Sequence, residues 1–467
     1  MTLLADLADL LGANHVLTGT DLARYASDWT THYTSAPCAV VRPGSTAEVA
    51  EVVKLAAKYA TPVVPVSGRT GLVGGAMTNG GLMLSVERLN RIRDLRPGTR
   101  IAIVEAGVVL DRLHEAAAAE GLYFPLWFGA RGSAMIGGVL STNAGGSNVL
   151  RYGSTRALCL GLEVVLPDGR ILNLMSELHK DNSGYDLRQM FIGAEGTLGI
   201  ITAAVMKLVP RPRAHATATL AARSLPDALT LLNRLQAASG GAVEAFEYMP
   251  AAYMRRLAEH RPDIRLPFDR RYDTNILVEI ATTMPRDATP GPDGTVPLVA
   301  LLEGVLAQMI EEGAVLDAEI AQNDAQRLAM WKRRELAAEV TFARQPAIDT
   351  DIALPLDKVP EFYTRIEARL ATIDPGCEML SVAHLGDGNV HYTVFPTRDG
   401  LHDIVVEAVE DVVQDLHGSF SAEHGVGLSK LNSMARRKDR VALDVMRAVK
   451  AAMDPMGLMN PGKVIPG

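Results

Sequence analysis

Hydrophobic residues follow two periodicities near the start of the chain. The stretches "CAVVRP" and "TPVVPV" are short and rich in valine, which is typical of buried β-strands. Between them, "STAEVAEVVKLAAKYA" repeats apolar residues at helical spacing, and Ser45 followed three residues later by Glu48 is the pattern of a helix N-terminus. Residues 38–65 are therefore predicted to form strand, helix and strand, and the opening "MTLLADLADLL" to form an amphipathic helix.

The pattern changes near residue 216. Strands are predicted at "ATATLAA", "AVEAFEYM", "NILVEIA" and "AVLDAEIA", with helices in "SLPDALTLLNRLQAAS" and at 298–312. This β-α-β-β-α-β order partly recurs over 347–423, where the last strand, "SFSAE", would end at Glu423. We therefore expect an α+β protein with an antiparallel sheet covered by helices on one face.

Changes in composition and hydrophobic pattern along the chain predict four parts. They are an N-terminal helical segment at 1–34, a glycine-rich domain at 35–214, a sheet domain at 215–422 and a C-terminal segment at 423–467. The turn-rich end "MDPMGLMNPGKVIP" carries Asn460 and Lys463 and is expected to dock onto the protein.

Composition excludes several classes of protein. The 467 residues carry a formal net charge of -8 with no long basic cluster, which argues against nucleic acid as the main partner. The N-terminus lacks the basic start of a signal peptide, and no apolar run approaches the ~20 residues that span a bilayer. Three distant cysteines, without a CxxC, fit a reducing cytoplasmic compartment and are interpreted as buried free thiols.

Glycine is concentrated in two tracts, "SGRTGLVGGAMTNGG" and "FGARGSAMIGGVLSTNAGGSNVLRYG". The first tract has the spacing of neither a dinucleotide fingerprint nor a P-loop. Glycines can serve turns and close packing, or they can let backbone amides approach phosphate oxygens. Two tracts between strands favour a bulky ligand that has phosphates and a large flat apolar part.

Several motifs together resemble a known family. "PVVPVSGRTGLVGGA", "GARGSAMIGGVLSTNAGGSNVLRYG" and "GAEGTLGIIT" resemble the FAD-binding domain of the vanillyl-alcohol-oxidase/PCMH flavoprotein superfamily. "HLGDGNVH", "SAEHGVG" and "MDPMGLMNPGK" resemble its FAD-linked D-2-hydroxy-acid dehydrogenase branch, which includes D-lactate dehydrogenase, the glycolate oxidase D subunit and D-2-hydroxyglutarate dehydrogenase. The resemblance covers about residues 35–467 and implies a PCMH-type FAD-binding domain of two α/β subdomains, followed by a substrate, or cap, domain.

The resemblance implies a set of FAD-binding residues. The first loop would wrap the pyrophosphate, the second tract would line the flavin, and the C-terminal tail would return to close over it. No histidine lies in the first loop, so non-covalent FAD is expected. The residues are Pro65, Ser67, Gly68, Arg69, Thr70, Gly71, Leu72, Gly74, Gly75, Gly132, Ser133, Ile136, Gly137, Gly138, Ser141, Asn143, Gly145, Gly146, Gly153, Gly196, Ile200 and Asn460.

Two imidazoles and a carboxylate form a candidate metal set. His384 and His391 flank the turn "LGDGN", and Glu423 could arrive from a neighbouring strand. Zn²⁺ accepts such ligands, although two surface histidines around a polar turn is the alternative interpretation. In the family, the matching residues bind a divalent metal, and the histidine that matches His424 is the base that takes the substrate's hydroxyl proton. The resemblance thus implies oxidation of a D-2-hydroxy acid to a 2-keto acid, with hydride transfer to flavin N5.

A substrate carboxylate requires a cation, and the family's arginine aligns with Arg334 in "WKRRE". The alternative is a solvated basic helix face. Two positions depart from the D-2-hydroxyglutarate enzymes: Asp349 replaces a lysine and Thr393 replaces an asparagine. Both family residues help to hold a second carboxylate, so the substrate is left open between D-lactate and a D-2-hydroxyglutarate-like acid.

Two other functions are considered. One is a metal-independent FAD alcohol oxidase that uses O₂, and the other is a non-catalytic flavin-binding subunit of a larger complex. Because no NAD fingerprint is present, the expected electron acceptor is an electron-transfer flavoprotein or a quinone. Membrane association, if present, would be peripheral, and a homodimer is compatible with the sequence.

Overall fold

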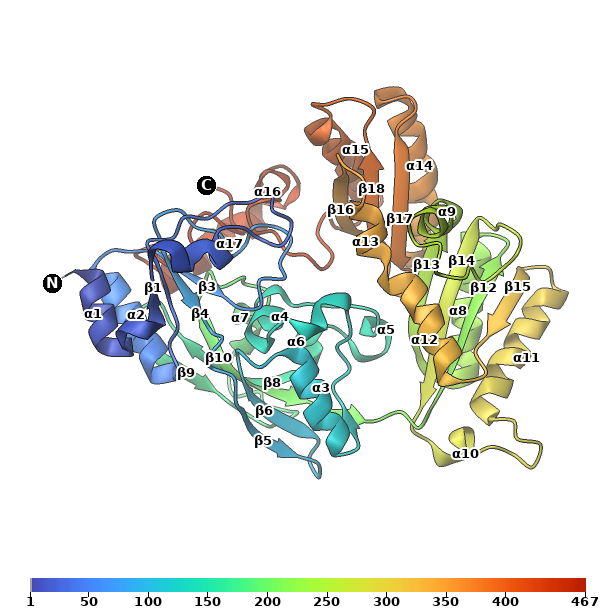
Figure 1. The fold of residues 1–467 in the computed structure, drawn as a ribbon, viewed down its shortest axis with the longest axis horizontal. Helices are drawn as coiled ribbons and strands as arrows, with labels where there is room; N and C mark the ends of the chain where they lie inside the picture. Colours follow the sequence, from blue (N-terminus) through green and yellow to red (C-terminus); the bar gives the residue numbers. More distant parts are fainter. Residues whose placement is uncertain (1) are drawn as a thin grey trace. The chain divides into compact units, whose positions relative to one another are not determined.

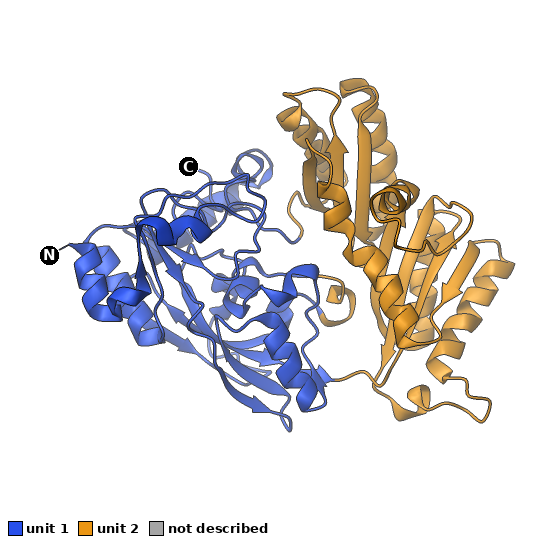
Figure 2. Cartoon of the chain, in the orientation of Figure 1, with its two compact units in different colours: residues 1–145, 153–210, 423–467 blue, residues 146–152, 211–422 orange. Residues whose placement is uncertain are grey.

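The computed structural model describes residues 2–467 and divides the chain into two compact units (Figure 2). Unit 1 comprises residues 1–145, 153–210 and 423–467, and unit 2 comprises residues 146–152 and 211–422. The chain therefore passes from one unit to the other after residues 145, 152, 210 and 422. In the described residues, no helix is both long and apolar enough to cross a membrane.

The first part of unit 1 is a four-stranded sheet with the order β1-β2-β4-β3, in which β2, β4 and β3 are parallel (Figure 1). The predicted helix start is present in α2, where Ser45 Oγ accepts from the Glu48 amide and Glu48 accepts from the Gly44 amide. The elements are α1 (Leu3–Leu11), η1 (Ala13–His15), β1 (Val16–Leu17), η2 (Gly19–Tyr25), β2 (Ala39–Val41), α2 (Thr46–Lys58), β3 (Val63–Val66) and β4 (Leu82–Ser85).

The second part of unit 1 is an antiparallel five-stranded sheet with the order β5-β6-β10-β8-β9. Its elements are β5 (Ile92–Arg96), β6 (Ile101–Glu105), α3 (Leu110–Ala119), β7 (Leu122–Tyr123), η3 (Gly129–Gly132), α4 (Ile136–Thr142), α6 (Thr155–Leu158), β8 (Cys159–Val165), β9 (Ile171–Leu174), α7 (Arg188–Phe191), β10 (Ile200–Lys207) and β11 (Val209–Pro210). The C-terminal helices α16 (Leu431–Arg437) and α17 (Arg440–Met453) also belong to this unit.

The C-terminal tail docks on unit 1, as predicted. The Val63 amide donates to the Leu458 carbonyl, and the Asn460 amide donates to the Val63 carbonyl. Met459 is buried in the same core cluster as α2 and the first sheet. The tail thus extends the edge at β3, directly before the first glycine tract.

Unit 2 is built on an antiparallel seven-stranded sheet with the order β15-β12-β14-β13-β17-β18-β16. The strands are β12 (Ala214–Ala222), β13 (Val243–Pro250), β14 (Thr274–Thr282), β15 (Val315–Ile320), β16 (Ile348–Ala353), β17 (Glu378–His384) and β18 (Asn389–Phe395). The helices are α5 (Val149–Tyr152), α8 (Leu225–Ser239), α9 (Ala251–His260), α10 (Pro285–Ala288), α11 (Pro297–Glu311), α12 (Asp324–Glu335), α13 (Ala337–Phe342), η4 (Leu356–Lys358), α14 (Val359–Ile373) and α15 (His402–Asp415).

Helices cover both faces of this sheet, so the expectation of one covered face is wrong. The large core cluster joins α8, α11, α14 and α15 to one face. A second cluster, containing Tyr253, Leu257 and Trp331, joins α9, α12 and α13 to the other face. The reason is that these helices also carry apolar residues at helical spacing, which must be buried.

Two further expectations are corrected. "SFSAE" is not a strand: only Ser419 bridges Ala353, and the Ser419 hydroxyl then bonds Ser421 in a local turn that competes with ladder pairing. The cysteines are unpaired, but Cys38 is exposed and Cys377 is half-buried. Cys159 alone is buried, and burial raises the pKa of its thiol to about 12.

Candidate active site

Three glycine-bearing segments of unit 1 converge. Close backbone approach explains the glycines, because side chains would collide with the neighbouring segment. A Cβ built on the glycine would lie 2.1 Å from the Ser133 carbonyl oxygen at Gly68, 3.1 Å from Ser67 Cβ at Gly138 and 2.3 Å from Pro65 Cγ at Gly196. By contrast, a Cβ on Gly71 would meet no atom within 4 Å, so this part of the loop borders open space.

The C-terminal tail joins this convergence through Asn460. Its Nδ2 donates to the carbonyls of Gly75, at 2.9 Å, and Glu195, at 2.7 Å. Its Oδ1 is buried without a hydrogen-bond partner in the described structure. A buried acceptor without a donor costs free energy, so this atom suits a ligand that supplies an N–H or O–H group. The glycine segments and Asn460 therefore fit FAD.

Glu195, in "GAEGTLG", was not predicted and holds the C-terminal loop. Its carboxylate oxygens accept from the amides of Val426, at 2.7 Å, and Gly427, at 2.9 Å. Gly425 and Gly427 have φ of +79° and +49°, a conformation that aims successive amides at one anion. Burial raises the pKa of Glu195, because its hydrogen-bond donors are neutral amides.

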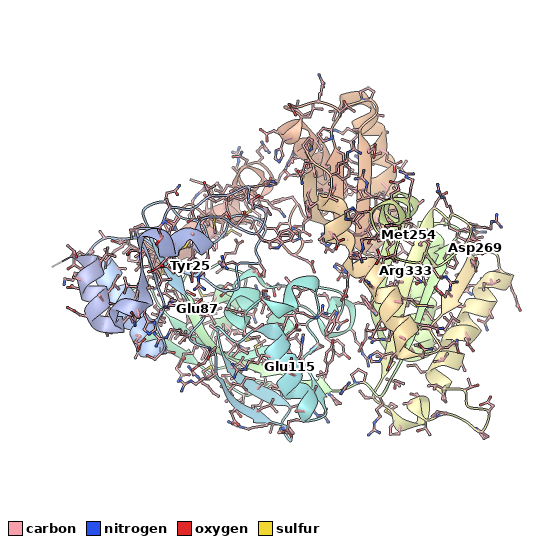
Figure 3. The ribbon with its side chains drawn as sticks, in the orientation of Figure 1. Tyr25, Glu87, Glu115, Met254, Asp269 and Arg333 are labelled. Carbon is pink, nitrogen blue, oxygen red and sulfur yellow. The ribbon has the colours of Figure 1, made fainter. Side chains whose placement is uncertain are left out.

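The other predicted cofactor residues lie in the same unit, apart from Gly146. Asn143 ends α4 in the left-handed conformation, and its Oδ1 accepts from the Ser154 hydroxyl and the Arg156 amide. Ile200 begins β10 and is buried. The Arg69 guanidinium lies over the Tyr25 ring, whose position in unit 1 is labelled in Figure 3.

In unit 2, His384 and His391 lie together at one end of the sheet. His384 ends β17 and His391 lies in β18, and their ring centroids are 5.5 Å apart at an angle of 79°. His391 Nδ1 is 3.7 Å from Asp351 Oδ1 on β16. Asn389 also donates to Asp351, at 2.9 Å. A carboxylate beside a ligating imidazole is the usual support of a metal site.

Glu247 of β13 links His384 to Arg334. Its carboxylate lies 2.9 Å from His384 Nδ1 and accepts from Arg334 Nε at 2.8 Å. Burial alone would raise the pKa of Glu247, but the charges of His384 and Arg334 outweigh it and lower the pKa. The Nη2 of Arg334 is buried without a partner in the described residues, and it therefore suits a ligand carboxylate.

Adjacent arginines of α12 have different partners. Arg333, labelled in Figure 3, donates to Glu319 at 3.1 Å and to the Arg265 carbonyl at 2.9 Å. Arg334 reaches Glu247 instead, since neighbouring helix residues point about 100° apart. The strand "AVEAFEYM" offered a signal for Glu247, because a carboxylate inside an apolar strand needs a partner.

Glu423 and His424 open the last segment of unit 1. They follow Ala422, whose amide donates to the Asp351 carboxylate at 3.2 Å within unit 2. Consecutive Cα atoms are about 3.8 Å apart. Glu423 and His424 therefore follow directly after a residue that is hydrogen-bonded to Asp351.

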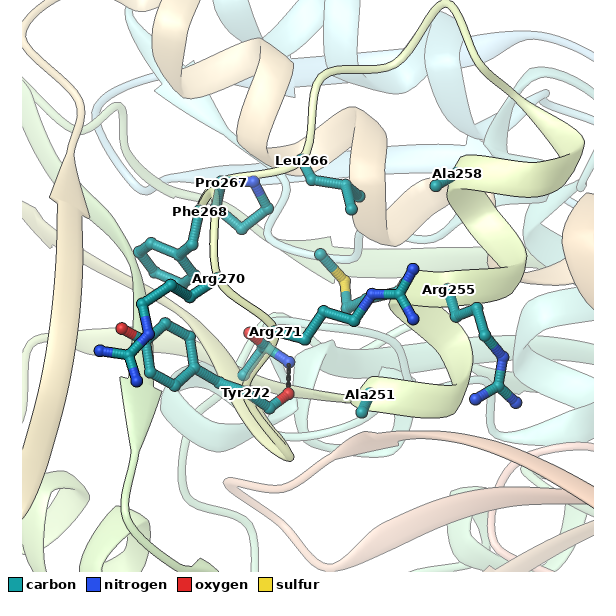
Figure 4. Close-up of a pocket in the computed structure, with 11 residues that line it drawn as sticks. Ala251, Arg255, Ala258, Leu266, Pro267, Phe268, Arg270, Arg271 and Tyr272 are labelled. Carbon is teal, nitrogen blue, oxygen red and sulfur yellow. Dashed lines mark hydrogen bonds between the residues drawn. The ribbon is translucent and has the colours of Figure 1, made fainter.

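A separate pocket of unit 2 contains none of the predicted site residues. It lies between α9 and the loop at 264–272 (Figure 4), where the Asn275 amide donates to the Tyr272 carbonyl at 2.9 Å. Its lining includes Met254, Arg255, Phe268, Arg270, Arg271 and Tyr272. Its arginines are exposed on a surface loop and helix, so solvation accounts for them.

Comparison with known proteins identifies the family. Residues 37–175 match the FAD binding domain model, and residues 211–464 match the model of the FAD linked oxidases, C-terminal domain. The chain belongs to the FAD-linked oxidase family. It is thus a flavoprotein oxidoreductase, and the predicted family and its FAD-binding domain are confirmed.

Relatives match over nearly the whole chain. A D-2-hydroxyglutarate dehydrogenase of Xanthomonas citri pv. viticola is 36% identical, covering 95% of this chain and 92% of that protein. One of Stutzerimonas stutzeri is 35% identical, covering 99% and 98%. Among solved structures, 4-ethylphenol oxidase from Gulosibacter chungangensis has a TM-score of 0.74 at 18% identity, covering 99% of this chain and 97% of that one. p-Cresol methylhydroxylase has a TM-score of 0.73 at 16% identity, covering 99% and 96%. These two likenesses concern the fold.

Proposed function

We propose that this protein is an FAD-linked dehydrogenase that oxidises a D-2-hydroxy acid to the 2-keto acid, with a divalent metal in its substrate site. The observation that carries the proposal is the chain Arg334–Glu247–His384. In it, one buried carboxylate joins an arginine whose Nη2 has no partner in the described residues to an imidazole of metal-ligand type. Relatives at 34 to 36% identity named D-2-hydroxyglutarate dehydrogenase support the substrate class.

His384, His391 and Glu423 are proposed to hold the metal, which fits Zn²⁺ best because two imidazoles and one carboxylate suit it. The Glu247 carboxylate fixes His384 through Nδ1, which leaves Nε2 as the nitrogen for the ion. The cation would supply a Lewis acid that lowers the pKa of the substrate hydroxyl. Arg334 would bind a substrate carboxylate through Nη2.

His424 is proposed to take the proton from the substrate hydroxyl. Its loop is held by Glu195, whose carboxylate accepts from the amides of Val426 and Gly427. A base must be held within hydrogen-bonding reach of the proton, so a rigid loop favours this role. FAD would supply the acceptor for the hydrogen that leaves Cα with its electron pair.

The chain length of the substrate depends on Asp349 and Thr393. Thr393 Oγ1 donates to Asp349 Oδ1 at 2.6 Å, on the same pair of strands as His391. A second substrate carboxylate near this pair would meet a negative charge, which favours D-lactate. The names of the relatives favour D-2-hydroxyglutarate. An electron-transfer flavoprotein or a quinone is the proposed acceptor.

Anaerobic flavin reduction tests the proposal. Oxidised protein is mixed with D- and L-forms of lactate and 2-hydroxyglutarate, and bleaching is followed at ~450 nm, with and without a chelator. We expect bleaching by a D-acid only, lost with the chelator and restored by Zn²⁺. Bleaching that survives complete metal removal would instead support a metal-independent alcohol oxidase. Bleaching by none of the acids would support a non-catalytic subunit.

A further inference from the structure

One short segment inside the FAD-binding region belongs to the substrate unit. Residues 146–152 pack in unit 2, although the residues on both sides of them belong to unit 1. Gly146 and Gly153 stand at the two joints with φ of +114° and +77°. Only glycine adopts these backbone angles readily, so the chain can turn sharply out of the glycine tract and back.

The first anchor of this segment is Leu150. Its side chain packs against the large core cluster of unit 2. A Cβ built on Gly386 would lie 2.7 Å from Leu150 Cδ2, so Leu150 rests directly on this glycine. Gly386 lies in the turn between His384 and His391, and its amide donates to the Phe246 carbonyl at 3.1 Å. Leu150 therefore covers the turn that carries both histidines.

The second anchor is Glu244. Its Oε1 accepts from Arg151 Nη1 at 3.0 Å and from the Tyr152 hydroxyl at 2.5 Å. Arg151 also donates to the Ala281 carbonyl at 2.7 Å. Glu244 is the extra residue of a β-bulge, since Val243 pairs with Ile280 while Ala245 pairs with Glu279. Such a bulge re-aims a side chain, here toward the inserted segment.

We infer that residues 146–152, which leave the glycine tract at Gly146, are a tether that fixes the His384–His391 turn, with Leu150 as a positioning residue and Glu244 as its anchor. The tether begins where the flavin-lining tract ends, at Gly146. Its other contact is the turn that would hold the metal. This inference rests on the proposed function, because it assigns the tether a role in the same reaction.

The contact itself supplies the test. Gly386→Ala adds a methyl group against Leu150, and its backbone angle is open to alanine, since Gly386 is absent from the positive-φ positions. Leu150→Ala removes the atoms that this methyl group would meet. We expect each single variant to slow flavin reduction at saturating D-acid by about tenfold, since misplacement by about 1 Å can cost more than that. The double variant should recover most of the rate, with FAD and metal content unchanged throughout.

Two further variants complete the design. Leu229→Ala removes the same atoms from a leucine of α8 that packs on the same core cluster, and it should leave the rate unchanged. Tyr152→Phe removes one hydroxyl from the Glu244 anchor with little risk to folding, and should slow reduction about threefold. The tether would be overturned if the rate losses of Gly386→Ala and Leu150→Ala multiply in the double variant. It would also be overturned if Tyr152→Phe reduces its flavin at the parental rate.

The same measurements separate the tether from the metal assignment. If the metal assignment is wrong, His391→Ala will reduce its flavin at the parental rate. If only the tether is wrong, His391→Ala will still abolish reduction, while Gly386→Ala and Leu150→Ala will act independently of each other.

Discussion

Two buried carboxylates, one in each unit, support residues of the candidate site in opposite ways. One binds backbone amides and the other binds side chains. Glu195 of unit 1 is bound by neutral backbone amides, and its pKa is raised by burial. Glu247 of unit 2 is completely buried, yet its contacts with His384 and Arg334 lower its pKa. Unit 1 therefore shapes a loop with backbone groups, whereas unit 2 concentrates charge at a site suited to an anion.

The largest expected effect tests whether the amide-held loop carries the proton chemistry. His424→Ala should slow flavin reduction by about 10²- to 10⁴-fold, because it removes the proposed general base. Anaerobic stopped-flow at saturating substrate measures the rate, and metal and FAD analysis should give full occupancy. A variant that bleaches at the parental rate would remove His424 from the mechanism.

The next effect tests the charged arrangement. Glu247→Ala leaves Arg334 and His384 without their buried partner, so it should destabilise unit 2 by about 3–5 kcal/mol. Denaturant unfolding followed by circular dichroism measures the loss. Glu51→Ala, which removes a half-exposed carboxylate paired with Lys54, is the control and should cost about 0–1 kcal/mol. Equal losses in the two variants would mean that burial of the charge is unimportant.

A smaller effect concerns pH. Because the folded protein raises the pKa of Glu195, it binds that proton more tightly than the unfolded chain, whose glutamate pKa is about 4.3. This group's contribution to the free energy of unfolding is therefore full below about pH 4.3 and declines as pH rises through the raised pKa. Glu195→Gln should flatten that decline, as measured by denaturant unfolding across pH. Parallel curves for parent and variant would argue against it.

The smallest effect concerns substrate choice. Asp349→Asn removes a charge beside Thr393 and should lower the KM for D-2-hydroxyglutarate relative to D-lactate by about threefold to tenfold, equivalent to about 1 kcal/mol. Steady-state kinetics with both acids measures the ratio. An unchanged ratio would place the second carboxylate elsewhere.

The sequence predicted local features well. The start of α2 and the turn-rich character of the docking tail both follow from residues close together in the chain. The strand at "SFSAE" failed for the same reason, since apolar alternation over five residues does not reveal that Ser419 bonds Ser421 instead of a neighbouring strand.

The hydrophobic pattern could not predict the long-range contacts that position the residues of the candidate site. Glu247 meets a histidine 137 residues away, and Glu195 meets an amide 231 residues away. Periodicity reports which face of an element is apolar, but it does not report which distant element will face it. The roles of His424, Arg334 and the metal ligands came from resemblance, and they remain predictions.

The four crossings of the chain between units have a consequence for how the protein can be divided. A fragment cut at residue 211 would hold all seven strands of unit 2, but it would leave Leu150, Arg151 and Tyr152 behind. Glu244 would then be exposed without its donors, and an apolar patch would open above Gly386. Unit 2 cut at residue 211 would thus lack part of its own packing, and a chimaera that exchanges it between relatives must also exchange residues 146–152.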